Sequence, residues 1–356
     1  MTASPDPAGE IAALIAADGP IPLSRFMGIA NAHYYATRDP FGAGGDFVTA
    51  PEISQMFGEL VGLCLADLWE RHGGGPAAYV ELGPGRGSLA EDALRAMKAA
   101  GLAPAAHLVE TSPVLRAAQA DRVAGATWHD TIETLPDDMP LLIVANEFFD
   151  ALPISQFIST VMGWREQMVT AEESDGATAF ALVPGTKLMD SLIPRHLLDA
   201  DPGGVFELNP EAIAIVSALA RRLAAQGGAM LIVDYGHDGS RHGDTLQAVR
   251  AHAYADPLAH PGQSDLTAHV DFLALEAAAA TAEARVFGPV EQGEWLIALG
   301  ISDRSAMLAR HTPARAQDIT AAYRRLTHPE EMGSLFKALA VVAPEWPDPA
   351  GFPQRR

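Results

Sequence analysis

Cysteine is almost absent from this chain of 356 residues, which contains Cys64 alone. A single cysteine cannot form a disulfide within the chain, and it has no companion for a thiolate metal cluster. Cys64 lies in an apolar stretch, so we expect it in the core rather than as a nucleophile. Nothing in the cysteine usage indicates an oxidising compartment.

Basic residues are also scarce, with 24 Lys and Arg against 45 Asp and Glu and a formal net charge of -21. Binding of DNA or RNA depends on basic side chains that neutralise phosphates, so this composition argues against a nucleic-acid partner. A cationic partner would suit an acidic surface better, although such a surface often serves only solubility.

Long apolar runs are missing as well, since none approaches the roughly 18 residues that a membrane span requires. Asp6, Glu10 and Asp18 precede the first basic residue, Arg25, which fits neither a secretory signal nor an arginine-rich transit peptide. The sequence therefore predicts a cytoplasmic protein without a membrane span.

What the chain does contain, from Ala77 onward, is a series of short apolar runs that alternate with amphipathic helices. This alternation is typical of βα units on a parallel sheet that is covered on both faces. Ser88 and Glu91 form a capping-box pattern at the start of the helix after the first strand. We therefore predict a doubly wound α/β core with a mostly parallel sheet. Its expected strands are 77–82, 107–110, 126–129, 141–146 and 230–234.

The remaining segments flank this core. Residues 1–75 have a helical pattern, with a glycine-rich loop over 39–46 and a helix expected over 49–72. Residues 151–206 and 236–292 break the alternation and exceed ordinary connections, so we expect substrate-side insertions or lids there. The predicted regions are an N-terminal helical lid over 1–75, a cofactor-binding core over 76–150 and 207–356, and a substrate-side insertion over 151–206.

The first strand of the core runs into a glycine loop, Gly83-Pro84-Gly85-Arg86-Gly87-Ser88. Bare amides and the positive end of the next helix would face a ligand together, which suits a nucleotide-bearing cofactor. Glycines are needed because a side chain would clash with the ligand or forbid a positive φ. The dinucleotide fingerprint asks for a further glycine where Ser88 stands, which disfavours a nicotinamide or flavin cofactor. The alternative is that the loop is only a tight turn.

Acidic and polar residues stand where the later strands are expected to end. Glu110 is placed where a carboxylate can bind both ribose hydroxyls, and Asp130 where an adenine amino group would be recognised. Asn146, Glu147 and Asp150 follow another apolar strand, and carboxylates at that edge could orient a positively charged acceptor. Two alternatives stay open, namely that Asp130 caps the next turn and that the 146–150 cluster is a helix N-cap.

Five segments together carry a pattern that is more specific than any one motif. They are residues 45–59 (GDFVTAPEISQMFGE), 81–87 (ELGPGRG), 146–153 (NEFFDALP), 233–236 (VDYG) and 265–272 (DLTAHVDF). In these segments, and in their order along nearly the whole chain, the sequence resembles the MidA-like class I methyltransferases. That family includes the mitochondrial respiratory complex I assembly factor with protein-arginine methyltransferase activity.

This resemblance implies a Rossmann-like class I methyltransferase core with S-adenosyl-L-methionine as its cofactor. By resemblance the three glycines of the loop would face the methionine part of the cofactor, Glu110 the ribose and Asp130 the adenine. Residues 46–54 would form the N-terminal lid over the site. The full set of expected cofactor-binding residues is Glu81, Gly83, Pro84, Gly85, Gly87, Glu110, Asp130 and Asn146.

The resemblance also implies an acceptor, which is an arginine side chain of a partner protein, a complex I (NADH dehydrogenase) subunit whose methylation supports assembly. A guanidinium stays charged at physiological pH, so an acidic pocket must orient it while one nitrogen attacks the sulfonium methyl. We predict this catalytic role for Glu147 and Asp150, helped by Glu52.

Two other functions stay open from the residues. One is an assembly chaperone that binds the cofactor without turnover, and the other is an NAD-dependent oxidoreductase. No metal site is predicted, because the histidines at positions 237, 242, 252, 260 and 269 lack the short fixed spacing of zinc ligands. The oligomeric state also stays open.

Overall fold

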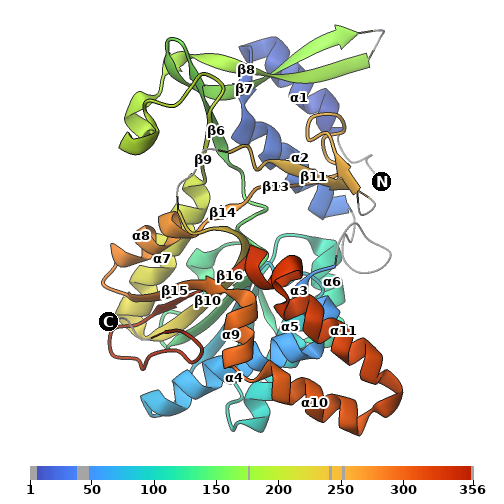
Figure 1. The fold of residues 1–356 in the computed structure, drawn as a ribbon, viewed down its shortest axis with the longest axis vertical. Helices are drawn as coiled ribbons and strands as arrows, with labels where there is room; N and C mark the ends of the chain where they lie inside the picture. Colours follow the sequence, from blue (N-terminus) through green and yellow to red (C-terminus); the bar gives the residue numbers. More distant parts are fainter. Residues whose placement is uncertain (1–5, 38–47, 175–176, 240–242, 251–252, 354–356) are drawn as a thin grey trace.

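The computed structural model describes residues 6–37, 48–174, 177–239, 243–250 and 253–353. Its main sheet occupies the lower half of Figure 1 and carries most of the core. The strands of this sheet are, in spatial order, β15 (Arg285–Glu291), β16 (Phe336–Val342), β10 (Gly228–His237), β5 (Leu141–Asn146), β2 (Ala78–Leu82), β3 (Ala105–Val109) and β4 (Thr127–His129), with β14 (Val270–Asp271) paired to the end of β10.

The direction of these strands matches a doubly wound fold. The five strands from β10 to β4 run parallel, whereas β16 is antiparallel to both of its neighbours. β2 and β5 are buried along their whole length, as expected for parallel strands with helices on both faces. The predicted fold class and all five predicted strands are confirmed.

Helices cover both faces of the main sheet. Tyr79 and Val80, neighbours on β2, point to opposite faces and belong to separate apolar clusters. The cluster of Tyr79 includes side chains of α4 (Gln55–His72), α5 (Ser88–Ala99), α9 (Gln292–Ala298), α10 (Ile301–His311) and α11 (Ala316–Thr327). The cluster of Val80 includes side chains of α7 (Pro210–Gln226) and α8 (Phe272–Ala280). α6 (Pro113–Arg122) follows β3.

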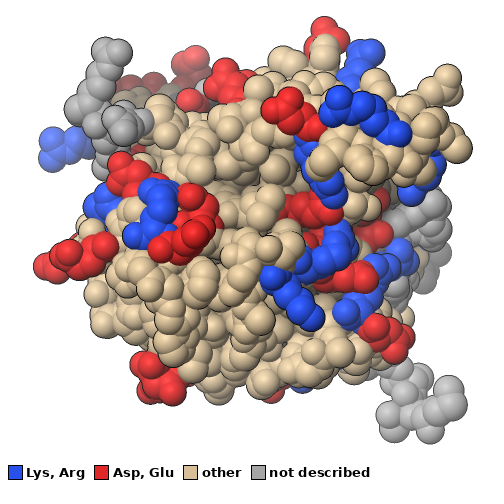
Figure 2. Space-filling model, turned by 90° about the horizontal axis from the view of Figure 1, so that it is seen from below, with Lys and Arg blue, Asp and Glu red and all other residues tan. Residues whose placement is uncertain are grey.

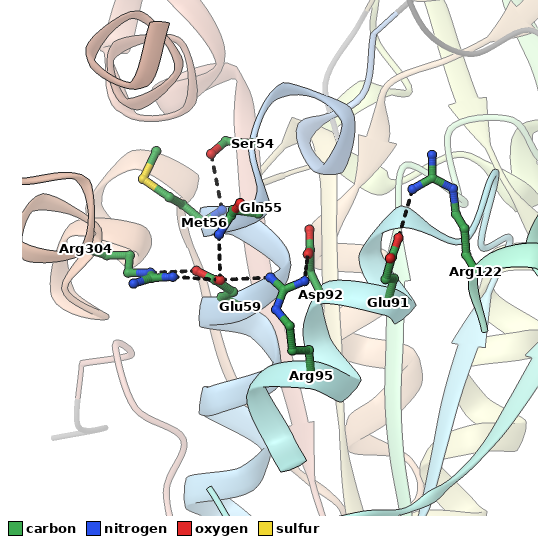
Figure 3. Close-up of polar contacts among 9 residues, drawn as sticks. All are labelled: Ser54, Gln55, Met56, Glu59, Glu91, Asp92, Arg95, Arg122 and Arg304. Atoms are coloured by element: carbon green, nitrogen blue, oxygen red, sulfur yellow. Dashed lines mark hydrogen bonds and ion pairs between the residues drawn. The ribbon is translucent and has the colours of Figure 1, made fainter. Parts of the chain in front are cut away.

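The C-terminal helices are fastened to this core by one carboxylate of α4, Glu59 (Figure 3). Arg304 of α10 donates two hydrogen bonds to it, at 2.7 and 2.8 Å. Arg95 of α5 donates a third at 2.9 Å, and Gln55 a fourth at 3.0 Å. The bonds to both guanidinium groups lower the pKa of Glu59 although burial, the largest single effect, raises it. This junction joins α10 to α4 and α5.

Two predictions about helices are wrong. The helix expected over 49–72 is two helices, α3 (Ala50–Ile53) and α4, because Ser54 is extended and its Oγ accepts the amide of Met56 at 3.2 Å. The capping box at Ser88 does not form, because Gly87 is the N-cap in the left-handed region. Ser88 therefore lies inside the first turn, and its hydroxyl donates to Glu52 instead.

A second sheet lies at the top of Figure 1, above the carboxyl ends of the main strands. It is antiparallel and consists of β1 (Ile21–Pro22), β7 (Gly163–Ser174), β6 (Ser155–Thr160) and β9 (Val205–Leu208), with β8 (Ala177–Leu188) paired to β7. The helices α1 (Pro7–Asp18) and α2 (Leu23–Thr37) pack on it through an apolar cluster that includes Phe26 and Val169. The division into regions proposed from the sequence stays a prediction.

A small third sheet lies between these two parts and completes the wall over the main sheet. It consists of β12 (Ala253–Ala255), β11 (Gln247–Arg250) and β13 (Asp265–Thr267), and α2 packs against β13. The glycine-rich loop over 39–46, and residues 46 and 47 of the expected lid, lie outside the described residues. The short helical turns of the chain are Ile132–Thr134, Asp190–Leu192, Arg195–Leu197, Pro313–Arg315 and Pro329–Gly333.

On the face seen from below in Figure 2, Lys and Arg side chains stand beside Asp and Glu side chains. Ion pairs of this kind include Arg71–Asp67 at 2.6 Å and Arg122–Glu91 at 2.9 Å. In the described part of the chain, no helix is both long and apolar enough to cross a membrane.

Candidate active site

A cavity of about 860 Å³ opens between the carboxyl ends of the main strands and the upper sheets. Its lining combines the glycine loop after β2, Glu110 after β3, residues 147, 148 and 150–153 after β5 and Tyr235 of β10 with residues of α2 and β13. Open α/β sheets bind ligands at this edge, and the volume is that of an ordinary ligand site. The predicted residues after three different strands thus meet in one place.

The glycine loop forms one end of the cavity. Gly83, Gly85 and Gly87 have φ of 59°, 53° and 83°, which other residues rarely adopt. A Cβ on Gly83 would also lie only 2.8 Å from Cδ2 of Phe148. Gln119 of α6 donates to the Gly85 carbonyl at 2.7 Å and lies 3.3 Å from Glu110 Oε2, so one buried amide links the loop to that carboxylate.

Glu110 and Asp130, both predicted to bind the cofactor, have different surroundings. Glu110 lines the cavity, accepts the Ser112 amide at 2.7 Å, and has a raised pKa because it is buried. Asp130 does not line the cavity: its side chain is 80% exposed and pairs with Arg116 at 2.6 Å. Arg116 Nε also donates to the Glu110 carbonyl at 2.7 Å. Arg116 thus links Asp130, on the outside of the cavity, to the backbone of Glu110, which lines it.

A much smaller pocket lies behind the glycine loop. Four predicted residues line this pocket and not the large cavity: Glu52, Glu81, Pro84 and Asn146. Glu81 is buried and accepts a hydrogen bond from Tyr79 at 2.6 Å, while burial raises its pKa to about 8. Glu52 accepts the Ser88 hydroxyl and lies 4.0 Å from Arg86. These four residues therefore support the loop from behind and do not line the large cavity.

Glu147 lines both the cavity and the small pocket. Its φ of 48° is a strained conformation for a residue with a side chain. Its carboxylate accepts the Ala50 amide at 3.1 Å and the Asn146 amide at 3.3 Å. Burial nevertheless raises the pKa of Glu147 to about 8. A strained, buried carboxyl group that titrates near neutrality is suited to proton transfer.

Asp150 is the second predicted carboxylate that lines the cavity. Burial raises its pKa to about 6, against a hydrogen bond with the Tyr235 hydroxyl that lowers it. The turn that carries Asp150 is shaped by Asp234, whose Oδ2 lies 3.0 to 3.3 Å from the amides of residues 148–150. No helix begins in residues 146–154, so the N-cap alternative for this cluster is wrong.

Comparison with known proteins shows the family to which the chain belongs. The S-adenosyl-L-methionine-dependent methyltransferase family matches residues 60–290. A Drosophila melanogaster relative, "Protein arginine methyltransferase NDUFAF7 homolog, mitochondrial", is 37% identical over 94% of this chain and 84% of its own. The Homo sapiens "Protein arginine methyltransferase NDUFAF7, mitochondrial" is 34% identical over 92% and 81%. The chain belongs to this methyltransferase family.

A crystal structure from Burkholderia thailandensis extends the likeness to the fold. It was solved bound to S-adenosyl-homocysteine, has a TM-score of 0.84 and 29% identity, and covers 97% of this chain and 93% of its own. The methyltransferase therefore uses S-adenosyl-L-methionine, as the resemblance implied. Its own residues fit that cofactor, because the bare backbone at Gly83 has no room for a Cβ and Glu110 presents a carboxylate to the same cavity. The S-adenosyl-L-methionine cofactor replaces the alternative interpretation of the chain as an NAD-dependent oxidoreductase.

The expected cytoplasmic location is contradicted by these comparisons. The relatives from Drosophila melanogaster, Danio rerio and Homo sapiens are named as mitochondrial proteins, which points to mitochondria rather than the cytoplasm. The expectation rested on the acidic N-terminal residues and the lack of cysteine pairs. These features reflect folding and solubility, and they do not specify the compartment in which a protein is located.

No role is predicted from the sequence for several residues that line the methyltransferase's cavity. They include Tyr35, Asp265 and Thr267. Asp265, Thr267 and His269 belong to a segment quoted for the resemblance, which was the one available signal. Of the five histidines that were considered as metal ligands, His242 and His252 lie outside the described residues. Among the residues described, no three His, Cys, Asp or Glu side chains form a group that could hold a metal.

Proposed function

We propose that this methyltransferase methylates an arginine side chain of a partner protein, and that the partner is a complex I (NADH dehydrogenase) subunit whose assembly this supports. The observation that carries the proposal is that two carboxylates, the partly buried Glu147 and the buried Asp150, line the same cavity as Gly83 and Gly85. The relatives named as protein arginine methyltransferases support the choice of acceptor.

For the cofactor we propose the residues expected from the sequence. The backbone of Gly83, Gly85 and Gly87 would bind the methionine part, and Glu110 the ribose hydroxyls. Asp130, joined to the Glu110 corner through Arg116, would recognise adenine at the outer rim. The residues behind the loop, Glu81, Pro84 and Asn146, would act by holding its shape.

The cofactor supplies an electrophilic methyl group on a positively charged sulfur. Asp150 would bind the guanidinium and offset its charge, because a charged group in a buried site needs an opposite charge beside it. The guanidinium must lose one proton when its nitrogen gains the methyl group. Glu147 would accept that proton in its ionised form, which becomes the main form only as the pH rises through about 8, because burial raises its pKa to about 8. Glu52 would contribute indirectly, by fixing Ser88 and the glycine loop.

The first test is calorimetric titration of the full chain with S-adenosylmethionine, S-adenosylhomocysteine and NADH. Binding of the first two alone is expected. The acceptor is then tested by incubating the protein with methyl-labelled S-adenosylmethionine and purified complex I subunits, with mass spectrometry to locate the label. Labelled arginine in the presence of the wild type and not of Glu147→Gln supports the proposal. Label on lysine alone refutes the acceptor, and cofactor binding without any transfer supports a non-catalytic chaperone instead.

A further inference from the structure

Acidic side chains outnumber basic ones in the lining of the cavity. In the described part of the chain, the Asp and Glu residues that line it are Glu110, Glu147, Asp150, Glu211 and Asp265, whereas Arg325 of α11 is the single Lys or Arg. S-adenosylmethionine has one negative group, the α-carboxylate of its methionine part. Acidic neighbours repel this carboxylate, and a charge that leaves water needs an opposite charge beside it. The protein must therefore supply a cation for it.

Arg325 stands near Glu147 and the start of the glycine loop. Burial, the largest effect, raises the pKa of Glu147, and the charge of Arg325 is among the effects that lower it. The Glu147 carboxylate accepts the amide of Ala50 in α3 at 3.1 Å, and α11 packs against α3 (Figure 1). Arg325 thus approaches the site from a segment far away in the chain.

A series of contacts leads from Glu110, proposed to bind the ribose, to this place. Gln119 hydrogen-bonds both Glu110 and the carbonyl of Gly85. Gly83, two residues before Gly85, lies against Phe148, the residue that follows Glu147. A methionine part that extends from the ribose along the glycine loop would therefore lead toward Glu147 and Arg325.

The backbone around Arg325 is held by buried contacts. Leu326 and Thr327, which directly follow it, are both buried. The buried Gln292 of α9 donates to the Leu326 carbonyl at 2.9 Å. Gly333 packs so closely on the next residue that a Cβ there would lie 2.2 Å from the Thr327 carbonyl oxygen. The position of the Arg325 backbone is thus fixed before a ligand arrives.

The side chain of Arg325 is, in contrast, available. It is exposed and forms no hydrogen bond or ion pair with another residue of the described ranges. Its neighbour Arg324 pairs with Glu331 at 3.0 Å and does not line the cavity. Arg325 is therefore a preplaced guanidinium at the cavity whose charge is not taken up by a carboxylate of the described chain.

The other positive features near the glycine loop already face a carboxylate. Glu52 accepts the hydroxyl of Ser88 in the first turn of α5 and lies 4.0 Å from Arg86. These three residues line the small pocket and not the large cavity. An anion in the large cavity is thus left with Arg325.

We propose that Arg325 binds the α-carboxylate of the methionine part of S-adenosylmethionine. Residues 292–335, which connect β15 to β16 and carry α9, α10 and α11, would then complete the cofactor site from outside the glycine-loop motif. A guanidinium can bind a carboxylate through two parallel N–H groups, which orients the methionine part as well as holding it. The inference rests on the proposed placement of the cofactor and is independent of the acceptor.

The test compares two ligands that differ only in the carboxylate. S-adenosylhomocysteine and its decarboxylated form, S-adenosyl-3-thiopropylamine, are titrated into the full chain by calorimetry. We expect the wild type to bind S-adenosylhomocysteine at least about tenfold more tightly, as a charged hydrogen bond allows. Arg325→Gln should weaken this binding at least tenfold and change the affinity for the decarboxylated ligand less than twofold. Arg325→Lys keeps the charge and should recover part of the loss.

The matched control is Arg324→Gln, which removes an exposed arginine from the same turn of α11. Both ligands should bind this variant within twofold of the wild type. Because Arg325 is exposed, Arg325→Gln should also unfold at the wild-type Tm. An equal loss of both ligands in Arg325→Gln, or no loss of either, would refute the role of Arg325. Equal affinity of the wild type for the two ligands would refute a carboxylate subsite altogether.

These outcomes are separate from those for the proposed function. A wild type that binds S-adenosylhomocysteine but transfers no methyl to arginine refutes the proposed acceptor, and the two-ligand comparison then still decides on Arg325. An Arg325→Gln variant with unchanged affinity for S-adenosylhomocysteine and a raised KM for the acceptor protein would assign Arg325 to an acidic group of the acceptor instead, and would overturn the inference.

Discussion

Replacement of Gly83 by alanine tests the glycine loop most directly, because the structure separates two costs at this position. One cost is the backbone conformation, since a side chain in the left-handed region costs roughly 1–2 kcal/mol. The other is space, since the new Cβ would lie 2.8 Å from Cδ2 of Phe148. Displacing a packed ring to make room costs roughly 1–3 kcal/mol more.

Gly101 provides the matched control. It ends α5 with a φ of 91°, and a Cβ there would meet nothing within 4 Å. Gly101→Ala should therefore lower the free energy of unfolding by the backbone cost alone, roughly 1–2 kcal/mol. Gly83→Ala has both costs and should lower it by roughly 2–5 kcal/mol. Urea unfolding of both variants and the wild type measures the difference in the free energy of unfolding. The comparison holds when the three proteins have the same m-value, which is the slope of this free energy with urea concentration.

Cofactor affinity should distinguish the two variants further. Phe148 follows Glu147 and lines the cavity, so a displaced ring moves the wall that the cofactor would touch. We expect calorimetry to find S-adenosylmethionine bound at least tenfold more weakly by Gly83→Ala, with no change for Gly101→Ala. Equal stability losses and equal affinities in the two variants would show that the Phe148 ring moves aside without a cost in free energy. This result would refute the proposed clash at Gly83.

Three further predictions concern single carboxylates. Glu110→Ala should weaken S-adenosylmethionine binding by about 1–3 kcal/mol through lost hydrogen bonds, and an unchanged calorimetric affinity would place the ribose elsewhere. Burial raises the folded pKa of Glu81 to about 8 from its ordinary value near 4.5, so Glu81 favours the folded state below about pH 4.5 and loses that contribution as the pH rises to 8. The gain in Tm of Glu81→Gln over the wild type should therefore be larger at pH 8 than at pH 5, and a pH-independent difference would contradict the raised pKa. Glu59→Ala leaves Arg304 and Arg95 without their shared partner and should lower Tm clearly more than Asp67→Ala, which breaks an exposed pair worth about 0–1 kcal/mol. Equal effects of these two variants would mean that the junction at Glu59 is an ordinary surface contact.

The parts of the fold that the sequence predicts depend on neighbours along the chain. The five parallel strands are short apolar runs that end at polar residues or glycines, and each is visible without knowledge of any partner strand. The same holds for the glycine loop, because the positive φ of Gly83 and Gly85 needs no distant residue to explain it. Strand ends of a parallel sheet share one edge, so Glu110, Glu147 and Asp150 could be expected at one cavity.

The predictions that failed depend on residues far away in the chain. Strand β15 was missed because Gly288 and Pro289 interrupt its pattern, and only pairing with β16, with a register shift between Phe287 and Val290, makes it a strand. The capping box failed because Gly87, in the left-handed region, is the N-cap and places Ser88 inside the first turn, where its hydroxyl donates to the distant Glu52.

The sequence by itself determined the parallel strands of the main sheet, the glycine loop and the family. These follow from local patterns of apolar residues, of glycines and of the polar residues that follow the strands. Tertiary structure alone decided which side chains line the wall of the cavity opposite the main sheet. Tyr35 and Asp265 meet there because α2 packs on β13 and Asn31 bonds across 120 and 235 residues of sequence. Contacts over such separations depend on the packing of whole elements, and the pattern of any single segment does not record them.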